Sequence, residues 1–168
     1  MAKLTMAQLR GTLHGTGRVE WIGLSSVRRG PITAVDDVMC WVGTGLDGDR
    51  HAKSGRGKRQ VTLIQAEHLP VMSALTGQTV RPEMLRRNIV VSGLNLIALK
   101  GARFRIGEAL LEGSGPCAPC SRMEENLGPG GYQAMRGHGG ITAIVVEAGV
   151  IRVGDAVTGV SLKASTEV

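Results

Sequence analysis

The segment that best indicates the fold of this chain is Gly113-Ser114-Gly115-Pro116-Cys117-Ala118-Pro119-Cys120-Ser121-Arg122. It holds two of the three cysteines in the chain. The prolines fix φ and remove two backbone donors, and the glycines allow the chain to approach its neighbours closely. The composition therefore predicts a rigid loop that displays thiols.

The residues on either side predict where this loop sits. Residues 103–112 are typical of a strand pair hinged at Gly107-Glu108, and residues 121–127 of a helix. Ser121 followed three residues later by Glu124 matches a capping box. Cys120 would then precede a helix N-terminus, where free N–H groups stabilise a thiolate and favour nucleophilic chemistry or metal binding. The alternative is that Cys120 is only a small buried hydrophobe.

Composition limits the class of protein. A length of 168 residues is enough for one domain, and 25 glycines among many Val and Ile residues indicate strands joined by tight turns. Aromatic residues make up only 2% of the chain, which argues against binding single-stranded nucleic acid by base stacking. No helix-turn-helix, zinc-finger or RNA-recognition pattern is present in the sequence, so we expect no nucleic-acid partner.

The net charge of +6 indicates an anionic ligand, because the basic residues are clustered. One cluster has no acidic residue within it and consists of Arg50, Lys53, Arg56, Lys58 and Arg59, and the second is Arg86-Arg87. Arg87 and Asn88 stand at a predicted strand entrance, where a guanidinium and an amide can clamp a phosphate or the edge of a heterocycle. A solvated basic face is the alternative for each residue alone.

The cysteine count and the N-terminus predict a cytoplasmic location. Three cysteines, with Cys40 remote from the other two, do not form the framework of a secreted disulfide protein. The first residues lack the apolar run of a signal peptide, and no later stretch is long and apolar enough to span a membrane. We therefore expect reduced thiols and no membrane partner.

Periodicity predicts many short strands and few helices. Strands are expected at residues 18–24, 32–42, 60–64, 89–91, 103–112 and 141–147 and twice within 149–157, with helices at 65–75, 82–85, 121–127 and 132–136. This pattern favours a mainly β fold, a barrel rather than an alternating βαβ sheet. We expect an N-terminal arm at residues 1–16, a barrel domain at 17–160 and a tail at 161–168.

Four motifs in register resemble the MOSC domain family. They are Gly45-Leu46-Asp47-Gly48-Asp49-Arg50-His51, Arg86-Arg87-Asn88-Ile89-Val90-Val91-Ser92-Gly93-Leu94, Pro119-Cys120 and Gly149-Val150-Ile151-Arg152-Val153-Gly154-Asp155-Ala156-Val157. The resemblance runs from about Gly17 to Val160. It implies the β-barrel of short strands shared by the C-terminal domain of molybdenum cofactor sulfurase and the amidoxime-reducing molybdoenzymes.

The resemblance also implies a site. A pterin-based molybdenum cofactor would lie in a cleft, with Cys120 as the metal ligand or the carrier of activated sulfur, and pyridoxal phosphate is not expected. Cys117 lies outside the family pattern and is a possible resolving thiol. His138, in the glycine loop 137–140, would lie near the open side of the metal. The cofactor-binding residues implied are Arg50, His51, Arg59, Arg87, Asn88 and His138.

Two function classes remain open at this point. One is an oxidoreductase that reduces N-hydroxylated substrates with electrons from a separate reductase, because the sequence has no ferredoxin-like cysteine cluster. The other is a carrier that delivers the cofactor or sulfur from Cys120 to an accepting enzyme. A zinc module or dithiol protein built on Cys117 and Cys120 is a third reading, which lacks a second Cys-x-x-Cys. A monomer or a homodimer fits all three.

Overall fold

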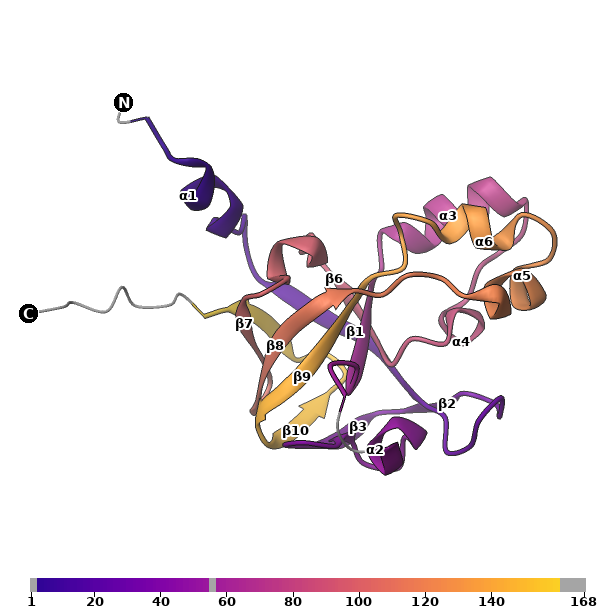
Figure 1. The fold of residues 1–168 in the computed structure, drawn as a ribbon, viewed down its shortest axis with the longest axis horizontal. Coiled ribbons are helices and arrows are strands. Elements are labelled where there is room, and N and C mark those ends of the chain that lie inside the picture. Colours follow the sequence, from indigo (N-terminus) through magenta and orange to yellow (C-terminus); the bar gives the residue numbers. More distant parts are fainter. Residues whose placement is uncertain (1–2, 55–56, 161–168) are drawn as a thin grey trace, which may run out of the picture.

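A computed structural model describes residues 3–54 and 57–160 of the chain, and within them seven strands close into a barrel (Figure 1). Neighbouring strands around the barrel are, in order, β1 (Gly17–Leu24), β11 (Ala156–Gly159), β7 (Arg103–Ile106), β8 (Ala109–Pro116), β9 (Ile141–Glu147), β5 (Val61–Gln65) and β6 (Ile89–Ser92). The barrel closes where β1 pairs with both β6 and β11. The mainly β barrel fold predicted from the sequence is confirmed.

One strand pair of the barrel is parallel. β5 and β6 run in the same direction, with Leu63 beside Ile89, whereas the other barrel pairs are antiparallel. A parallel pair needs a crossover, which α3 (His68–Thr76) and α4 (Pro82–Leu85) supply. Gly77 ends α3 with a left-handed φ of 68°. The predicted barrel therefore contains one βαβ unit, which carries Arg86, Arg87 and Asn88 into the entrance of β6.

Side chains on β5 and β6 alternate in direction and pack into two separate hydrophobic cores. Leu63 and Ile89 point into the barrel interior, while Ile64 and Val90 point outward under the helices. The outer core is completed by apolar residues of α3, α4, α5 (Ser121–Leu127) and α6 (Gly131–Met135), among them Met72, Leu85, Met123 and Met135. Both faces of these strands are buried, which explains their nearly continuous apolar sequences. In Figure 1 these four helices gather on one side of the barrel.

Residues 32–42, predicted as one strand, form two. β2 (Thr33–Val35) pairs with β1, and β3 (Asp37–Trp41) leaves that sheet to pair with β10 (Gly149–Arg152) and β4 (Gly45–Leu46). The buried side chains of this small sheet, such as Cys40 and Ile151, join the barrel core. The motif at residues 45–51 contains β4 and the start of α2 (Arg50–Ser54).

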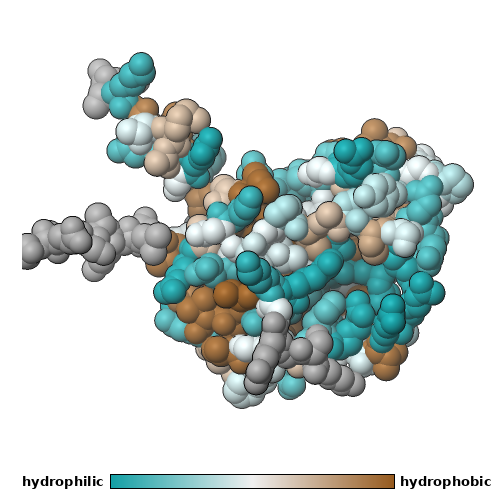
Figure 2. All heavy atoms as spheres, in the orientation of Figure 1, coloured by the Kyte–Doolittle hydropathy of each residue, from teal (hydrophilic) through white to brown (hydrophobic). Residues whose placement is uncertain are grey.

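The first helix stands apart from the barrel. α1 (Met6–Gly11) has a capping box between Thr5 and Gln8 but no buried residue, and Figures 1 and 2 show it clear of the main body. The domain boundaries at residues 16 and 160 stay predictions, and the predicted tail at 161–168 lies outside the described residues. No helix in the described ranges is long and apolar enough to cross a membrane.

Candidate functional site

The predicted loop at residues 113–122 is shorter than expected, because β8 continues to Pro116 through its pairing with β9 and α5 begins at Ser121. Residues 117–120, the cysteine segment, connect the two elements and present one thiol outward. Cys120 is the exposed N-cap residue of α5, whereas Cys117 and Cys40 are buried. The predicted capping box at Ser121 is wrong. Ser121 is already helical, and the carboxylate of Glu124 instead accepts the backbone N–H groups of Gly130 and Tyr132, each at 2.8 Å. The Glu124 carboxylate therefore stabilises the turn that leads into α6, whereas the capping-box motif predicted that it would cap the start of α5.

Cys120 opens onto a cavity of about 240 Å³, called here the basic pocket. Its wall brings together segments far apart in the sequence, and seven of its twelve lining residues are arginines. The lining residues are Arg28, Arg29, Arg50, His51, Arg59, Thr62, Arg86, Arg87, Cys120, Ser121, Arg122 and Met123. No carboxylate of the described residues lines this pocket. Such a wall attracts anions, because guanidinium groups form strong charge-assisted hydrogen bonds to oxyanions.

Two of these arginines hold unusual backbone conformations. Arg29 and Arg86 are the non-glycine residues with positive φ in the described ranges, at 62° and 55°. A left-handed residue of this kind costs about 1–2 kcal/mol. The Arg86 side chain donates to the carbonyl of Gly30 at 2.9 Å and to the hydroxyl of Ser25 at 3.3 Å, so it ties the loop after β1 to the pocket. Backbone strain here coincides with the pocket wall, as it often does at functional sites.

The arginines of the pocket crowd one another. Burial lowers the pKa of Arg86, and the neighbouring charges of Arg122 and Arg50 lower it further. Cys120 and Asp49 act in the opposite direction and favour the charged guanidinium. An anion in the pocket would relieve this repulsion between like charges.

Arg87 is a buried scaffold for the cysteine segment. The residue is 3% exposed, and burial lowers the pKa of its guanidinium. Its N–H groups donate to four backbone carbonyls, those of Leu85 at 3.1 Å, Cys117 at 3.0 Å, Ala118 at 3.3 Å and Gly139 at 2.9 Å. Arg87 thereby joins the βαβ unit, the cysteine segment and the glycine loop.

Asn88 lies behind the pocket and not in its lining. Its side-chain oxygen accepts from the backbone N–H and the hydroxyl of Thr62, and its amide donates to Gly23 and to the carboxylate of Asp49 at 3.1 Å. Asp49 in turn contacts Nδ1 of His51 at 2.8 Å. Burial alone would raise the pKa of Asp49, but hydrogen bonds from His51 and the backbone of Ser25 outweigh it and lower the pKa. The chain Asn88 to Asp49 to His51 orients the histidine in the wall.

Arg59 links the pocket to the second cysteine. Its Nη2 donates to the buried Sγ of Cys117 at 3.0 Å, and the Arg87 guanidinium donates to the backbone carbonyl of the same residue. Cys117 therefore lies behind the pocket wall, whereas Cys120 faces the open space.

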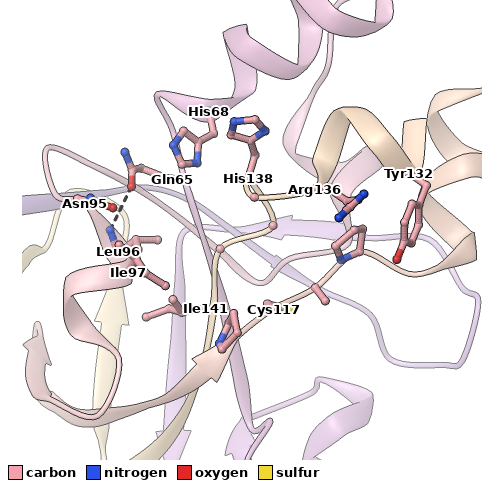
Figure 3. Close-up of a pocket in the computed structure, with 16 residues that line it drawn as sticks. Gln65, His68, Asn95, Leu96, Ile97, Cys117, Tyr132, Arg136, His138 and Ile141 are labelled. Carbon is pink, nitrogen blue, oxygen red and sulfur yellow. Dashed lines mark hydrogen bonds between the residues drawn. The ribbon is translucent and has the colours of Figure 1, made fainter. Parts of the chain in front are cut away.

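His138 lines a different cavity. This second cavity, of about 570 Å³, lies along residues 116–119 and also contains His68, Tyr132 and Arg136 (Figure 3). The rings of His138 and His68 meet edge to face with their centres 5.0 Å apart, and His68 is half-buried. Burial, followed by the charge of His138, lowers the pKa of His68.

Glycines let the loop before β9 pack against the cysteine segment. A Cβ at Gly139 would collide with the carbonyl oxygen of Cys117, and one at Gly140, whose φ is 81°, with that of Leu63. The backbone N–H of Cys117 donates to Gly140 at 2.9 Å. The glycine loop 137–140 is thus packed against the cysteine segment and lines the second cavity.

Of the predicted site residues, Arg50, His51, Arg59, Arg87 and Cys120 meet at the basic pocket. Sequence reasoning named Arg86 only as part of a basic cluster and did not assign Arg28, Arg29 and Arg122 to the site, although the doublet 28–29 was a visible signal. The predicted basic run also included Lys58, which is outside the lining, and Arg56 and the side chain of Lys53, which lie outside the described residues. In the described ranges, no group of three or more His, Cys, Asp or Glu residues is placed to hold a metal ion.

Comparisons with known proteins agree on one fold. A family model described as the MOSC domain matches residues 47–158. Among solved structures, the YuaD protein from Bacillus subtilis superposes with a TM-score of 0.76 at 22% identity, covering 90% of this chain and 99% of its own. YiiM from Escherichia coli superposes with a TM-score of 0.66 at 24% identity, covering 87% of this chain and 71% of its own. None of the curated proteins matches this sequence.

Proposed function

This chain belongs to the MOSC domain family, and on that premise we propose that its basic pocket binds a phosphate-bearing, pterin-based molybdenum cofactor with Cys120 as the protein ligand to the metal. One observation carries the proposal: the exposed thiol of Cys120 opens onto a cavity walled by seven arginines.

The residues present fit such a cofactor. A thiolate is a soft ligand that suits a thiophilic metal, and Cys120 supplies one from a loop that Arg87 holds in place. Guanidinium groups suit the phosphate of the pterin, and Arg50, Arg86 and Arg122 offer theirs on the same wall. Arg87 within this wall and Asn88 behind it hold the wall in place, because their polar groups are already used within the protein.

The reaction we propose is the reduction of N-hydroxylated substrates. The bound cofactor would supply two-electron redox chemistry, which side chains alone lack. Overall, two electrons and two protons break the N–O bond, and the products are the parent amine-type compound and water. The electrons would come from a separate reductase. The chain's own residues bind the anionic part of the cofactor and fix the cysteine segment.

A carrier role is the second candidate. The observation that favours it is the contrast between the two thiols, since Cys120 is exposed and Cys117 is buried behind it. A carrier needs only one accessible thiol that can hold sulfur as a persulfide, or the metal as a thiolate, and a partner enzyme to accept the cargo. In that case the protein would have no reductase activity of its own.

The test is to purify the protein from cells that make the pterin cofactor and to measure bound pterin by fluorescence after oxidative release. Arg50→Gln is compared with Arg105→Gln, which removes the same charge from an exposed ion pair with Glu147. We expect pterin in the wild type and in Arg105→Gln, and a loss of about 10-fold or more in Arg50→Gln. Equal pterin in all three, or none in the wild type, would overturn the proposal.

Activity then separates the two roles. The loaded wild type is mixed with an artificial electron donor and an N-hydroxylated base, and the reduced product is measured. Turnover supports the oxidoreductase. Loaded protein without turnover, together with a mass increase of one sulfur atom located on Cys120, supports the carrier.

A further inference from the structure

We infer that the second cavity, the one lined by His138, is a binding site for a small aromatic carboxylate that carries a hydroxyl group. This cavity has a volume of about 570 Å³ and lies along residues 116–119, whereas Cys120 opens onto the basic pocket. The site goes beyond the proposed function, because the proposed cofactor and its thiol ligand belong to the basic pocket.

Aromatic side chains are scarce in this protein and gather at the second cavity. The chain has one tyrosine and four histidines, and the lining contains that tyrosine, Tyr132, together with His68 and His138. Figure 3 shows the two histidine rings next to each other and Tyr132 on a different side of the cavity. The buried side chains of Leu96 and Ile141 add apolar surface. Such walls favour an aromatic ligand, because rings pair well when stacked or edge to face.

His68 contributes a buried polar atom that the protein leaves unsatisfied. Its Nδ1 is buried and makes no hydrogen bond to any residue in the part of the chain that the structure describes. Native proteins keep few such atoms, because burying a polar group without a partner is destabilising. A ligand hydroxyl can satisfy this nitrogen whether it carries a proton or not, since a hydroxyl both donates and accepts.

Arg136 supplies the charge of the site. Among the described residues that line the cavity, Arg136 is the one with a permanent charge. Its Nη1 donates to the side-chain oxygen of Gln133 at 3.2 Å, and it makes no ion pair with a carboxylate of the described ranges. A guanidinium in this state favours a carboxylate, with which it forms charge-assisted hydrogen bonds. Figure 3 shows Arg136 beside Tyr132 and apart from His68, so a ring between them can present its carboxylate to one and its hydroxyl to the other.

Hydrogen bonds fix the walls of the cavity before any ligand binds. The Glu124 carboxylate accepts the backbone N–H of Tyr132 at 2.8 Å, and Nδ1 of His138 lies 3.2 Å from the carbonyl oxygen of Ala134. The opposite wall is held by the side-chain oxygen of Gln65, which accepts the backbone N–H of residue 96 at 3.1 Å. A preformed site loses little conformational entropy on binding, which suits a small ligand.

The experiment is an NMR titration of isotope-labelled, cofactor-free full chain, followed by the backbone amide shifts. The probes are meta- and para-hydroxybenzoate, benzoate and the two matching hydroxybenzamides. We expect the better hydroxybenzoate to shift the amides of residues 132–140, to bind about 10-fold more tightly than its amide and to bind about 3-fold or more tightly than benzoate. Binding of no acid, or equal affinity for acid and amide, would overturn the inference.

Paired arginine variants test whether the carboxylate lies in this cavity, because the basic pocket also attracts anions. Arg136→Gln should weaken hydroxybenzoate binding by about 10-fold, while Arg50→Gln, which removes the same charge from the basic pocket, should change it by less than about 2-fold. The reverse order, or equal weakening by both, would overturn the inference. Thermal unfolding of each variant confirms that it is folded before titration.

His68→Phe tests the role of the unsatisfied nitrogen, because it keeps a ring and removes the polar atom. We expect the variant to bind benzoate within about 2-fold of the wild type and to lose its preference for hydroxybenzoate over benzoate. Its melting temperature should be no lower than that of the wild type, because no hydrogen bond of Nδ1 is lost. A preference for hydroxybenzoate that survives the substitution would overturn the inference. These titrations need neither molybdenum nor pterin, so their failure is distinguishable from failure of the proposed function.

Discussion

Replacing Arg87 with methionine should destabilise the protein itself, whether or not a cofactor is bound. Methionine replaces the aliphatic part of the arginine side chain but removes the N–H donors to four backbone carbonyls. One of these carbonyls belongs to the exposed residue Ala118, and the other three belong to buried residues. About three buried carbonyls then lose their partners at roughly 1–1.3 kcal/mol each. The expected loss is about 3–4 kcal/mol in the free energy of unfolding.

The assay is urea unfolding of cofactor-free protein, supported by thermal unfolding. A loss of about 3–4 kcal/mol corresponds to a fall of roughly 10 °C in melting temperature for a domain of this size. Arg105→Met is the control, since its side chain is 40% exposed in an ion pair and should cost less than about 1 kcal/mol. A loss below about 1 kcal/mol for Arg87→Met, combined with a loss of anion binding, would refute the scaffold role.

Three further outcomes follow from the same contacts. A thiol reagent should modify Cys120 rapidly in the native protein and leave Cys40 and Cys117 unmodified. Both of these cysteines are buried, and burial raises the pKa of Cys40 to about 12. Rapid reaction of two thiols per chain would contradict this prediction. The pKa of Asp49 is lowered in the folded state, so the stability it contributes is present above about pH 4 and lost as the pH falls further, and Asp49→Asn should flatten this acid limb in urea melts. Gly139→Ala should cost about 2 kcal/mol or more, because its Cβ would collide with the carbonyl of Cys117, and unchanged unfolding would show that the loop can move away.

Much of the barrel was predictable because its strands alternate or run continuously apolar. β7 and β8, with their turn at Gly107, follow directly from local pattern. The division of residues 32–42 was not predictable, because β2 and β3 are both extended and differ only in which strand they pair with. The capping box failed for a similar reason, since the partners of Glu124 lie in a turn several residues away.

The sequence predicted which types of residue form the site better than it predicted the role of each residue. Clustered basic residues and one cysteine indicated an anion site, and five of the predicted residues do meet at the basic pocket. Arg87 and Asn88 carry the expected polar groups, yet these bind carbonyls and Asp49 within the protein. The positive φ of Arg29 and the place of His138 beyond the cysteine segment depend on tertiary contacts that no local spacing encodes.

The most direct test of the central claim is elemental analysis for molybdenum, tungsten and zinc on protein purified from cells that make the pterin cofactor. Wild type is compared with Cys120→Ala and with Cys117→Ala, which removes the buried neighbour of the same segment. We predict near-stoichiometric molybdenum or tungsten that is lost with Cys120→Ala and retained with Cys117→Ala. Zinc lost with either substitution would contradict the account, and so would metal content that does not depend on Cys120.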